Sequence, residues 1–214
     1  MEKVAIFDLD GTVLDTQEDI ADCMNKTIEL FGYKKRSYAE YKQVIGNDAS
    51  NFMRKLLGDL PTEKLMEIWR SYEKVYDRYG IVKTKLFDGI NEVLIALKER
   101  GYKLSLLTNK TPEELAPFIP VFFTNSPFDD IIGVGNTDGA KPSPKEVLRI
   151  LSDFNVEKEN AYLIGDGETD ILAAVNAKIT PIAVLWGNRT REQLKAVGAN
   201  IFVDTPKEIL NILK

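Results

Sequence analysis

Two aspartates, Asp8 and Asp10, stand one residue apart at the end of the apolar run at 4–7. A short apolar run of this kind is typical of a fully buried strand. Two carboxylates at the mouth of such a strand each need a counter-charge, a metal ion or a proton, because an isolated buried charge is strongly destabilising. Gly11 follows and allows the backbone to turn sharply and approach a ligand closely. Together these residues indicate a functional site.

Polar residues also follow three later apolar runs of the chain. They are Thr108, Asn109, Lys110, Lys141, Asp166 and Asp170, after the runs at 103–107, 131–134 and 161–164. In an open parallel sheet, ligands bind outside the carboxyl ends of the strands. We therefore expect these side chains to share one crevice with the two opening aspartates.

Several acids in one crevice would repel one another unless a cation joined them. Carboxylate oxygens without histidine or thiolate partners favour Mg²⁺, and the chain has no histidine and a single cysteine, Cys23. A dication and a lysine together bind a phosphoryl group strongly. One opening aspartate is then available as a nucleophile and the other as a proton carrier, which is the chemistry of covalent phosphoryl transfer.

The elements that position these residues alternate between helices and short apolar strands from residue 86 onward. We expect strands at 4–7, 103–107, 131–134, 161–164, 181–185 and 201–203. Such alternation predicts an α/β fold with a doubly wound, Rossmann-like parallel sheet covered by helices on both faces. The first strand is separated from the others by a block of helical patterning. The sequence therefore predicts a discontinuous catalytic core, 1–14 and 84–214, with an inserted helical cap domain, 15–83.

Helix signals recur through the inserted block. Thr16 with Asp19, and Ser37 with Glu40, are predicted to form capping boxes. The longest predicted helix runs from Pro61 and carries an apolar stripe made of Leu65, Ile68, Trp69, Tyr72, Val75, Tyr76 and Tyr79. We expect this stripe to pack helices together and not to hold a ligand.

Composition narrows the class of protein further. The 214 residues are 44% hydrophobic and 29% charged, which suits a globular protein with a real core. The net charge of −5 argues against nucleic acid as a partner. No run approaches the roughly 20 apolar residues that span a bilayer, and one cysteine fits a reducing compartment. Because the chain runs directly into a predicted strand, we expect no signal peptide. We expect a cytoplasmic monomer or weak homodimer that acts on a small phosphorylated metabolite, with no membrane partner.

The motifs resemble those of a known family. Asp8-Leu9-Asp10-Gly11-Thr12, Thr108-Asn109-Lys110, Lys141-Pro142 and Gly165-Asp166 with Asp170 are similar to the four motifs of the haloacid dehalogenase-like hydrolase superfamily, helical-cap subclass. Phe87-Asp88-Gly89, Trp186-Gly187 and Gly198-Ala199 resemble its phosphoglycolate phosphatase-like members. The resemblance covers essentially the whole chain and is weakest in the cap.

This resemblance implies distinct roles for the acids. Asp8 would attack phosphorus and become an aspartyl phosphate, while Asp10 would protonate the leaving oxygen and then activate water. Mg²⁺ would be bound by the side chains of Asp8 and Asp166 and the main-chain carbonyl of Asp10, with Asp170 supporting it directly or through water. Dehalogenases of the superfamily lack the acid at position 10, so the chain resembles the phosphatases.

The resemblance also implies a phosphate-binding set. Thr108 would hold phosphoryl oxygen, and Lys141 would neutralise both nucleophile and phosphate. Asn109 and Gly11 are further candidates, from their places beside the crevice. Lys110 is expected to stay outside the chemistry, at most reaching the rim.

Alternatives remain open at this point. A pyrophosphatase or a sugar phosphomutase would use the same core, and a receiver-type signalling module or a non-catalytic phospho-ligand binder belongs to a different class. In the cap, Gly46-Asn47-Asp48 stands where related phosphatases often carry an apolar or proline-containing substrate loop. Asn47, Asp48 and Arg54 are therefore candidates for contact with the leaving group.

Overall fold

Six parallel strands form the central sheet of the computed structural model, which describes residues 2–47, 49–135 and 137–214. They are β1 (Lys3–Phe7), β4 (Tyr102–Thr108), β5 (Asp130–Gly133), β6 (Ala161–Gly165), β7 (Thr180–Val184) and β8 (Phe202–Val203). Their order in space is β5-β4-β1-β6-β7-β8. The chain thus winds outward from β1 in one direction and then in the other, which confirms the predicted doubly wound sheet and puts the switch point beside β1.

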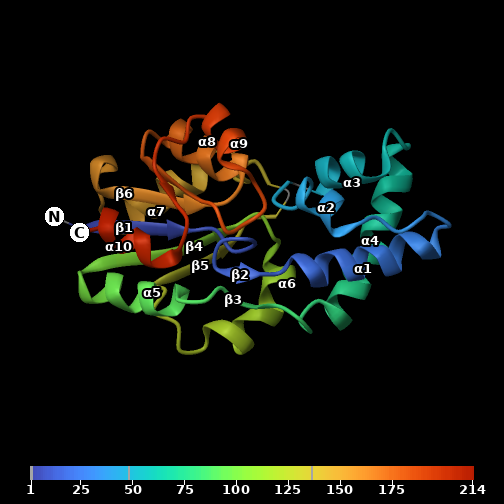
Figure 1. The fold of residues 1–214 in the computed structure, drawn as a ribbon, viewed down its shortest axis with the longest axis horizontal. Coiled ribbons are helices and arrows are strands. Elements are labelled where there is room, and N and C mark those ends of the chain that lie inside the picture. The colour runs from blue at the N-terminus through green and yellow to red at the C-terminus, as the bar shows by residue number, and fades with distance from the viewer. Residues whose placement is uncertain (1, 48, 136) are drawn as a thin grey trace.

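Helices cover both faces of this sheet (Figure 1). On one side lie α5 (Ile90–Glu99) and the short α10 (Ile209–Ile212), and on the other lie α7 (Lys145–Asp153), α8 (Glu168–Ala177) and α9 (Arg191–Ala196). Side chains of β1 alternate between the two layers, since successive residues of a strand point to opposite faces. Ala5 and Phe7 pack in one buried cluster and Val4 and Ile6 in another. β1 is therefore a buried central strand, and Asp8 lies directly after its carboxyl end.

Four helices of the inserted segment project from one end of the sheet (Figure 1). They are α1 (Gln17–Leu30), α2 (Tyr38–Lys42), α3 (Ala49–Leu57) and α4 (Thr62–Tyr79). α4 packs against both α1 and α3. The ends of the segment meet in a two-stranded antiparallel pair, β2 (Leu14–Asp15) with β3 (Lys85–Leu86), which the sequence did not predict. The division into a core and a cap domain at the stated boundaries stays a prediction.

One of the two predicted capping boxes is wrong. Thr16 precedes α1 without a capping hydrogen bond from its side chain, and its hydroxyl donates to Asp10 Oδ1 at 2.6 Å instead. Asp19 Oδ2 accepts from the amides of residues 82–84 at 2.7–3.0 Å and from the Thr84 hydroxyl at 2.7 Å. Tertiary partners thus outcompete the local cap. The box of Ser37 and Glu40 is confirmed.

Shorter elements complete the chain between the strands. They are α6 (Pro112–Leu115), the 3-10 turns η1 (Ala116–Phe118), η3 (Lys158–Asn160) and η4 (Pro206–Glu208), and the π-helical turn η2 (Ile119–Phe123). Within the described residues, no helix combines the length and the apolar character needed to cross a bilayer.

Candidate active site

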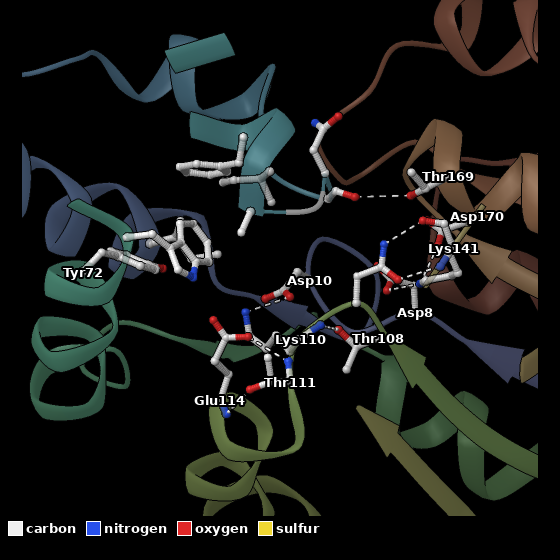
Figure 2. Close-up of a pocket in the computed structure, with 18 residues that line it drawn as sticks. Asp8, Asp10, Tyr72, Thr108, Lys110, Thr111, Glu114, Lys141, Thr169 and Asp170 are labelled. Atoms are coloured by element: carbon white, nitrogen blue, oxygen red, sulfur yellow. Dashed lines mark hydrogen bonds and ion pairs between the residues drawn. The ribbon is translucent and has the colours of Figure 1, made fainter. Parts of the chain in front are cut away.

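A pocket of about 730 Å³, including its open mouth, lies between the carboxyl ends of the strands and the inserted helices (Figure 2). From the sheet side it is lined mainly by polar groups: Asp8, Asp10, Thr108, Lys110, Lys141 and Asp170. From the helical side it is lined mainly by apolar and aromatic groups: Ile20, Ile45, Ala49, Phe52, Trp69 and Tyr72. The predicted convergence of the strand-end residues on one crevice is therefore observed for all of them except Asp166, which does not line this pocket. A carboxylate oxygen of Asp166 nevertheless lies within 4.8 Å of oxygens of Asp8 and Asp170.

Lys141 lies at the buried centre of the charged wall. Its Nζ donates to Asp8 Oδ1 and to Asp170 Oδ1, both at 2.6 Å, and to the Leu107 carbonyl at 2.8 Å. The residue is only 4% exposed. Burial alone would lower the pKa of this ammonium, but Asp170 and Asp8 outweigh it and raise the pKa above its ordinary value. Lys141 therefore stays charged and holds the two carboxylates at fixed positions.

Three buried carboxylates, those of Asp8, Asp166 and Asp170, offer oxygen atoms that all lie within 4.8 Å of one another. Burial and the neighbouring charge of Asp170 raise the pKa of Asp8 well above its ordinary range, and the same two causes raise the pKa of Asp166 to about 6. One lysine does not neutralise three acids. The cluster is built of hard oxygen donors and carries excess negative charge, so its residues fit a divalent cation.

Asp166 is oriented by neighbours from two other loops. Its Oδ2 accepts from the Asn188 amide at 2.6 Å and the Asn188 side chain at 2.8 Å, and its Oδ1 accepts from the Thr12 hydroxyl at 3.4 Å. Gly11 has φ +88°, and a Cβ there would stand 2.3 Å from Asp166 Oδ2. The close approach expected of Gly11 is real, but it is an approach to Asp166; a role in phosphate binding stays a prediction.

Asp10 occupies a different environment from Asp8. Its carboxylate accepts from Thr16 Oγ1 at 2.6 Å and pairs with Lys110 Nζ at 2.9 Å. The Asp10 side chain is not a member of the acidic cluster, so only its main-chain carbonyl remains a candidate metal ligand. Two neighbouring carboxylates thus have separate partners, one set around Lys141 and one around Lys110.

Lys110 was expected at most to reach the rim of the crevice, but it lines the pocket and pairs with Asp10; whether it takes part in the chemistry stays a prediction. Its ammonium lies 5.3 Å from the ring centroid of Tyr76 and 5.7 Å from that of Phe118, enclosed beside Asp10. Burial lowers the pKa of this group, but Asp10, Tyr72 and Glu114 together raise it above the ordinary value. Its place directly after a strand end was the available signal, and the tendency of loop lysines to be solvated masked it.

The remaining predicted residues divide between pocket wall and scaffold. Thr108 is 1% exposed, lines the pocket and accepts from the Lys110 amide at 3.2 Å. Asn109 also lines the pocket, but its side chain binds the backbone of Lys141 twice, at 2.8 and 2.9 Å. It therefore fixes the loop that delivers Lys141. Asp170 Oδ2 accepts from the Gly167 amide at 2.9 Å.

Among the cap candidates, Asn47 lines the pocket and Arg54 instead donates to the Thr62 hydroxyl at 3.0 Å. Asp48 lies outside the described residues.

Sequence reasoning missed Arg189, a buried residue that joins the two parts of the molecule. Its Nε donates to Glu168 at 2.6 Å, and its guanidinium also donates to the carbonyls of Lys42, Gln43 and Ile45. The last of these carbonyls belongs to Ile45, which lines the pocket together with the residues that follow it. Extending the strand-end rule to the loop after β7 would have drawn attention to Arg189 and to Asn188.

Comparison with known proteins gives one consistent family. A profile described as haloacid dehalogenase-like hydrolase matches residues 5–184. A phosphoglycolate phosphatase of Aquifex aeolicus is 34% identical over 186 residues, covering 86% of this chain and 85% of that protein. A putative pyrophosphatase of Caldanaerobacter subterraneus is 32% identical over 211 residues, covering 98% and 93%.

Solved structures agree with this assignment. The crystal structure of a putative phosphoglycolate phosphatase from Lactobacillus delbrueckii superposes with a TM-score of 0.91 at 26% identity, covering 100% of this chain and 99% of that one. The motifs, the strand order and the relatives thus confirm the resemblance inferred from the sequence. The chain belongs to the haloacid dehalogenase-like hydrolases and is similar to the phosphoglycolate phosphatases among them.

Proposed function

We propose that the protein is a Mg²⁺-dependent phosphatase that hydrolyses a small phosphorylated metabolite, such as a phosphoglycolate-like or sugar phosphate, through an aspartyl phosphate on Asp8. The observation that carries this proposal is the separate environment of the two opening carboxylates, which face one pocket. Asp8 is held by Lys141 in the acidic cluster, and Asp10 is held by Thr16 and Lys110. Two carboxylates with different surroundings suit two different roles.

The reaction would proceed in two steps, transfer of the phosphoryl group to Asp8 and hydrolysis of the aspartyl phosphate. A carboxylate oxygen of Asp8 attacks phosphorus, the bond from phosphorus to the ester oxygen breaks, and Asp10 gives that oxygen a proton so that the alcohol leaves. Asp10 then takes a proton from a water molecule, whose oxygen attacks the phosphorus of the aspartyl phosphate. Inorganic phosphate leaves, the Asp8 carboxylate is restored, and Asp10 again carries its proton.

The other residues would position and neutralise the phosphoryl group. Lys141 is within hydrogen-bond distance of the attacking carboxylate, and Thr108 offers a hydroxyl beside it. Asp8, Asp166 and the carbonyl of Asp10 would hold Mg²⁺, with Asp170 acting directly or through water. Bound Mg²⁺ would offset the negative charge that the phosphoryl oxygens and the acidic cluster bring together.

Phosphate release from a generic aryl phosphate tests this proposal. We expect turnover with Mg²⁺ and none with a chelator. Asp8→Asn should abolish turnover in a protein with an unchanged circular dichroism spectrum. Asp10→Asn should slow it by roughly 10²–10⁴-fold and let phosphoprotein accumulate. Asp59→Asn, at an exposed site, is the matched control. Full activity in Asp8→Asn would exclude Asp8 as the nucleophile.

A pyrophosphatase is the second candidate, favoured by the 32% identity to the putative pyrophosphatase. A panel of phosphoglycolate, sugar phosphates, nucleotides and pyrophosphate separates the two. Phosphate release from pyrophosphate with none from the monoesters would favour the second candidate.

A further inference from the structure

The wall of the pocket on the side of the inserted helices is built from carbon-rich side chains. Phe52, Trp69 and Tyr72 come from α3 and α4 and line the pocket together with Ile20, Ile45 and Ala49. The aromatic stripe of α4 was expected only to pack helices, and two of its members instead line the pocket. Figure 2 shows Tyr72 across the pocket from Asp8, with Asp10 and Lys110 between them.

The aromatic rings on this wall support one another. The ring centroids of Phe52 and Trp69 are 5.7 Å apart in an edge-to-face arrangement, and those of Trp69 and Tyr72 are 5.0 Å apart. Phe52 and Tyr72 are each 4% exposed, so most of their surface is packed. The wall is therefore preformed, and a flat group entering the pocket would meet rings that are already held in place.

The charges around this wall do not favour a second anion on the substrate. Within the described part of the chain, the pocket is lined by two lysines and no arginine, and both lysines already pair with acids: Lys141 with Asp8 and Asp170, Lys110 with Asp10. Glu114 adds another carboxylate to the lining.

Lys55 of α3, which contacts the pocket-lining residue Asn47, also has a protein partner. Lys55 Nζ donates to Asn47 Oδ1 at 2.9 Å and lines a separate groove. Among the described lining residues, every cationic side chain is already ion-paired with an acid. A carboxylate or second phosphate on the leaving group would thus lack a positively charged partner and would lie beside aromatic rings that do not solvate it.

We propose that the leaving group of the physiological substrate is uncharged and largely apolar, and that a flat ring on it packs against Trp69, Phe52 and Tyr72. This inference rests on the phosphatase chemistry proposed above, and it replaces the phosphoglycolate-like and sugar phosphates named there with a different class of monoester. It favours a phosphomonoester of an aromatic or apolar alcohol over phosphoglycolate and over pyrophosphate, whose leaving groups carry charge.

A series of three alkyl esters tests the inference without the bias of an activated leaving group. Ethyl phosphate is the reference, 2-phenylethyl phosphate adds a ring, and phosphoglycolate adds a carboxylate. We expect kcat/KM for 2-phenylethyl phosphate to exceed that for ethyl phosphate by roughly tenfold, from burial of the ring. Phosphoglycolate should be no better than ethyl phosphate.

Substitutions test whether the preference for 2-phenylethyl phosphate over ethyl phosphate depends on the aromatic wall. Trp69→Leu should reduce the ratio of 2-phenylethyl to ethyl phosphate by roughly fivefold, while Tyr79→Leu, an exposed aromatic of the same helix, should leave the ratio unchanged. Thermal unfolding checks that both variants fold, and Phe52→Leu replaces Trp69→Leu if the latter does not. An unchanged ratio in the folded wall variant, or a preference for phosphoglycolate, overturns the inference.

Binding to Asp8→Asn, measured by calorimetry in Mg²⁺, separates the two levels of the proposal. If no ester is hydrolysed but 2-phenylethyl phosphate binds more tightly than ethyl phosphate and phosphoglycolate, the phosphatase proposal fails and the wall assignment stands. If hydrolysis occurs and phosphoglycolate binds most tightly, the phosphatase proposal stands and the wall assignment fails. If none of the three is hydrolysed or bound, both fail.

Discussion

Replacing Asp166 with asparagine is expected to stabilise the metal-free protein and to remove most of its response to Mg²⁺. Asp166 is 3% exposed and has a pKa of about 6, raised by burial and by Asp170. An asparagine keeps the shape. Its carbonyl can accept from Asn188, and its NH₂ can donate to Thr12, so the neighbouring hydrogen bonds survive. What it removes is one buried charge next to two others.

The magnitude follows from the pKa of Asp166. An acid whose pKa is raised in the folded state contributes fully to stability below its unfolded value of 3.8 and loses that contribution as pH rises through about 6. At pH 7.5 the loss is on the order of 3 kcal/mol. The carbonyl oxygen of asparagine is a weaker hydrogen-bond acceptor than a carboxylate oxygen, and this difference lowers the stability of the variant by about 1 kcal/mol. The net gain of about 2 kcal/mol corresponds to a rise of about 4–8 °C in Tm for a chain of this size.

Thermal unfolding in a chelator at pH 7.5 and pH 5, followed by circular dichroism, measures this gain. At pH 5 the stability that the wild type loses through ionised Asp166 falls to about half of its value at pH 7.5. The difference in Tm between Asp166→Asn and the wild type should therefore shrink. Adding Mg²⁺ at pH 7.5 should raise the Tm of the wild type and have little effect on the variant. A Tm for Asp166→Asn below that of the wild type in chelator at pH 7.5 would refute the reasoning, as would an advantage independent of pH. Asp59→Asn, at an exposed site, is the control.

Three further substitutions probe the surroundings of the site. Gly11→Ala places a methyl group 2.3 Å from an Asp166 oxygen at φ +88°, so we expect phosphate release to fall at least tenfold; wild-type turnover would show that Asp166 can move freely. Lys141→Met leaves buried carboxylates unpaired, which should cost about 3–5 kcal/mol in urea unfolding at pH 7.5, with partial recovery in Mg²⁺; unchanged stability would contradict the role given to the ammonium. Asp19→Ala strips the amides of 82–84 of their acceptor, so hydrogen exchange should accelerate there, and exchange at the wild-type rate would show that these hydrogen bonds are dispensable.

Much of the site could be predicted because its signals are local in sequence. When a buried strand is followed directly by an acidic residue, the pattern predicts both the position of the acid and its need for a partner. This applies to Asp8 and to Asp166. The parallel sheet then brings the strand ends together, so Lys141 could be inferred without knowing its contacts. The doubly wound order follows from the same alternation of strands and helices.

What could not be predicted depends on contacts between distant segments. Lys110 is buried because Tyr76 and Phe118 close over it, and nothing in its neighbouring residues indicates that enclosure. Thr16 and Asp19 have the spacing of a capping box, yet their side chains are bound by residues elsewhere in the fold. Trp69 and Tyr72 share the periodicity of a packing stripe, and only the position of α4 over the strand ends brings them to the pocket.

The pairing of β2 with β3 has an evolutionary consequence. Leu14 lies opposite Leu86 and Asp15 opposite Lys85, so the inserted segment leaves the sheet and returns to it at one point. A segment whose ends are adjacent can be exchanged for another of different length without displacing the strands that it interrupts. Recombination at this pair would replace the aromatic wall as one unit and leave the contact between Asp8 and Lys141 in place. Because Thr16, which donates to Asp10, lies inside the exchanged segment, a new segment would have to supply that donor again for the chemistry to be inherited with a new substrate.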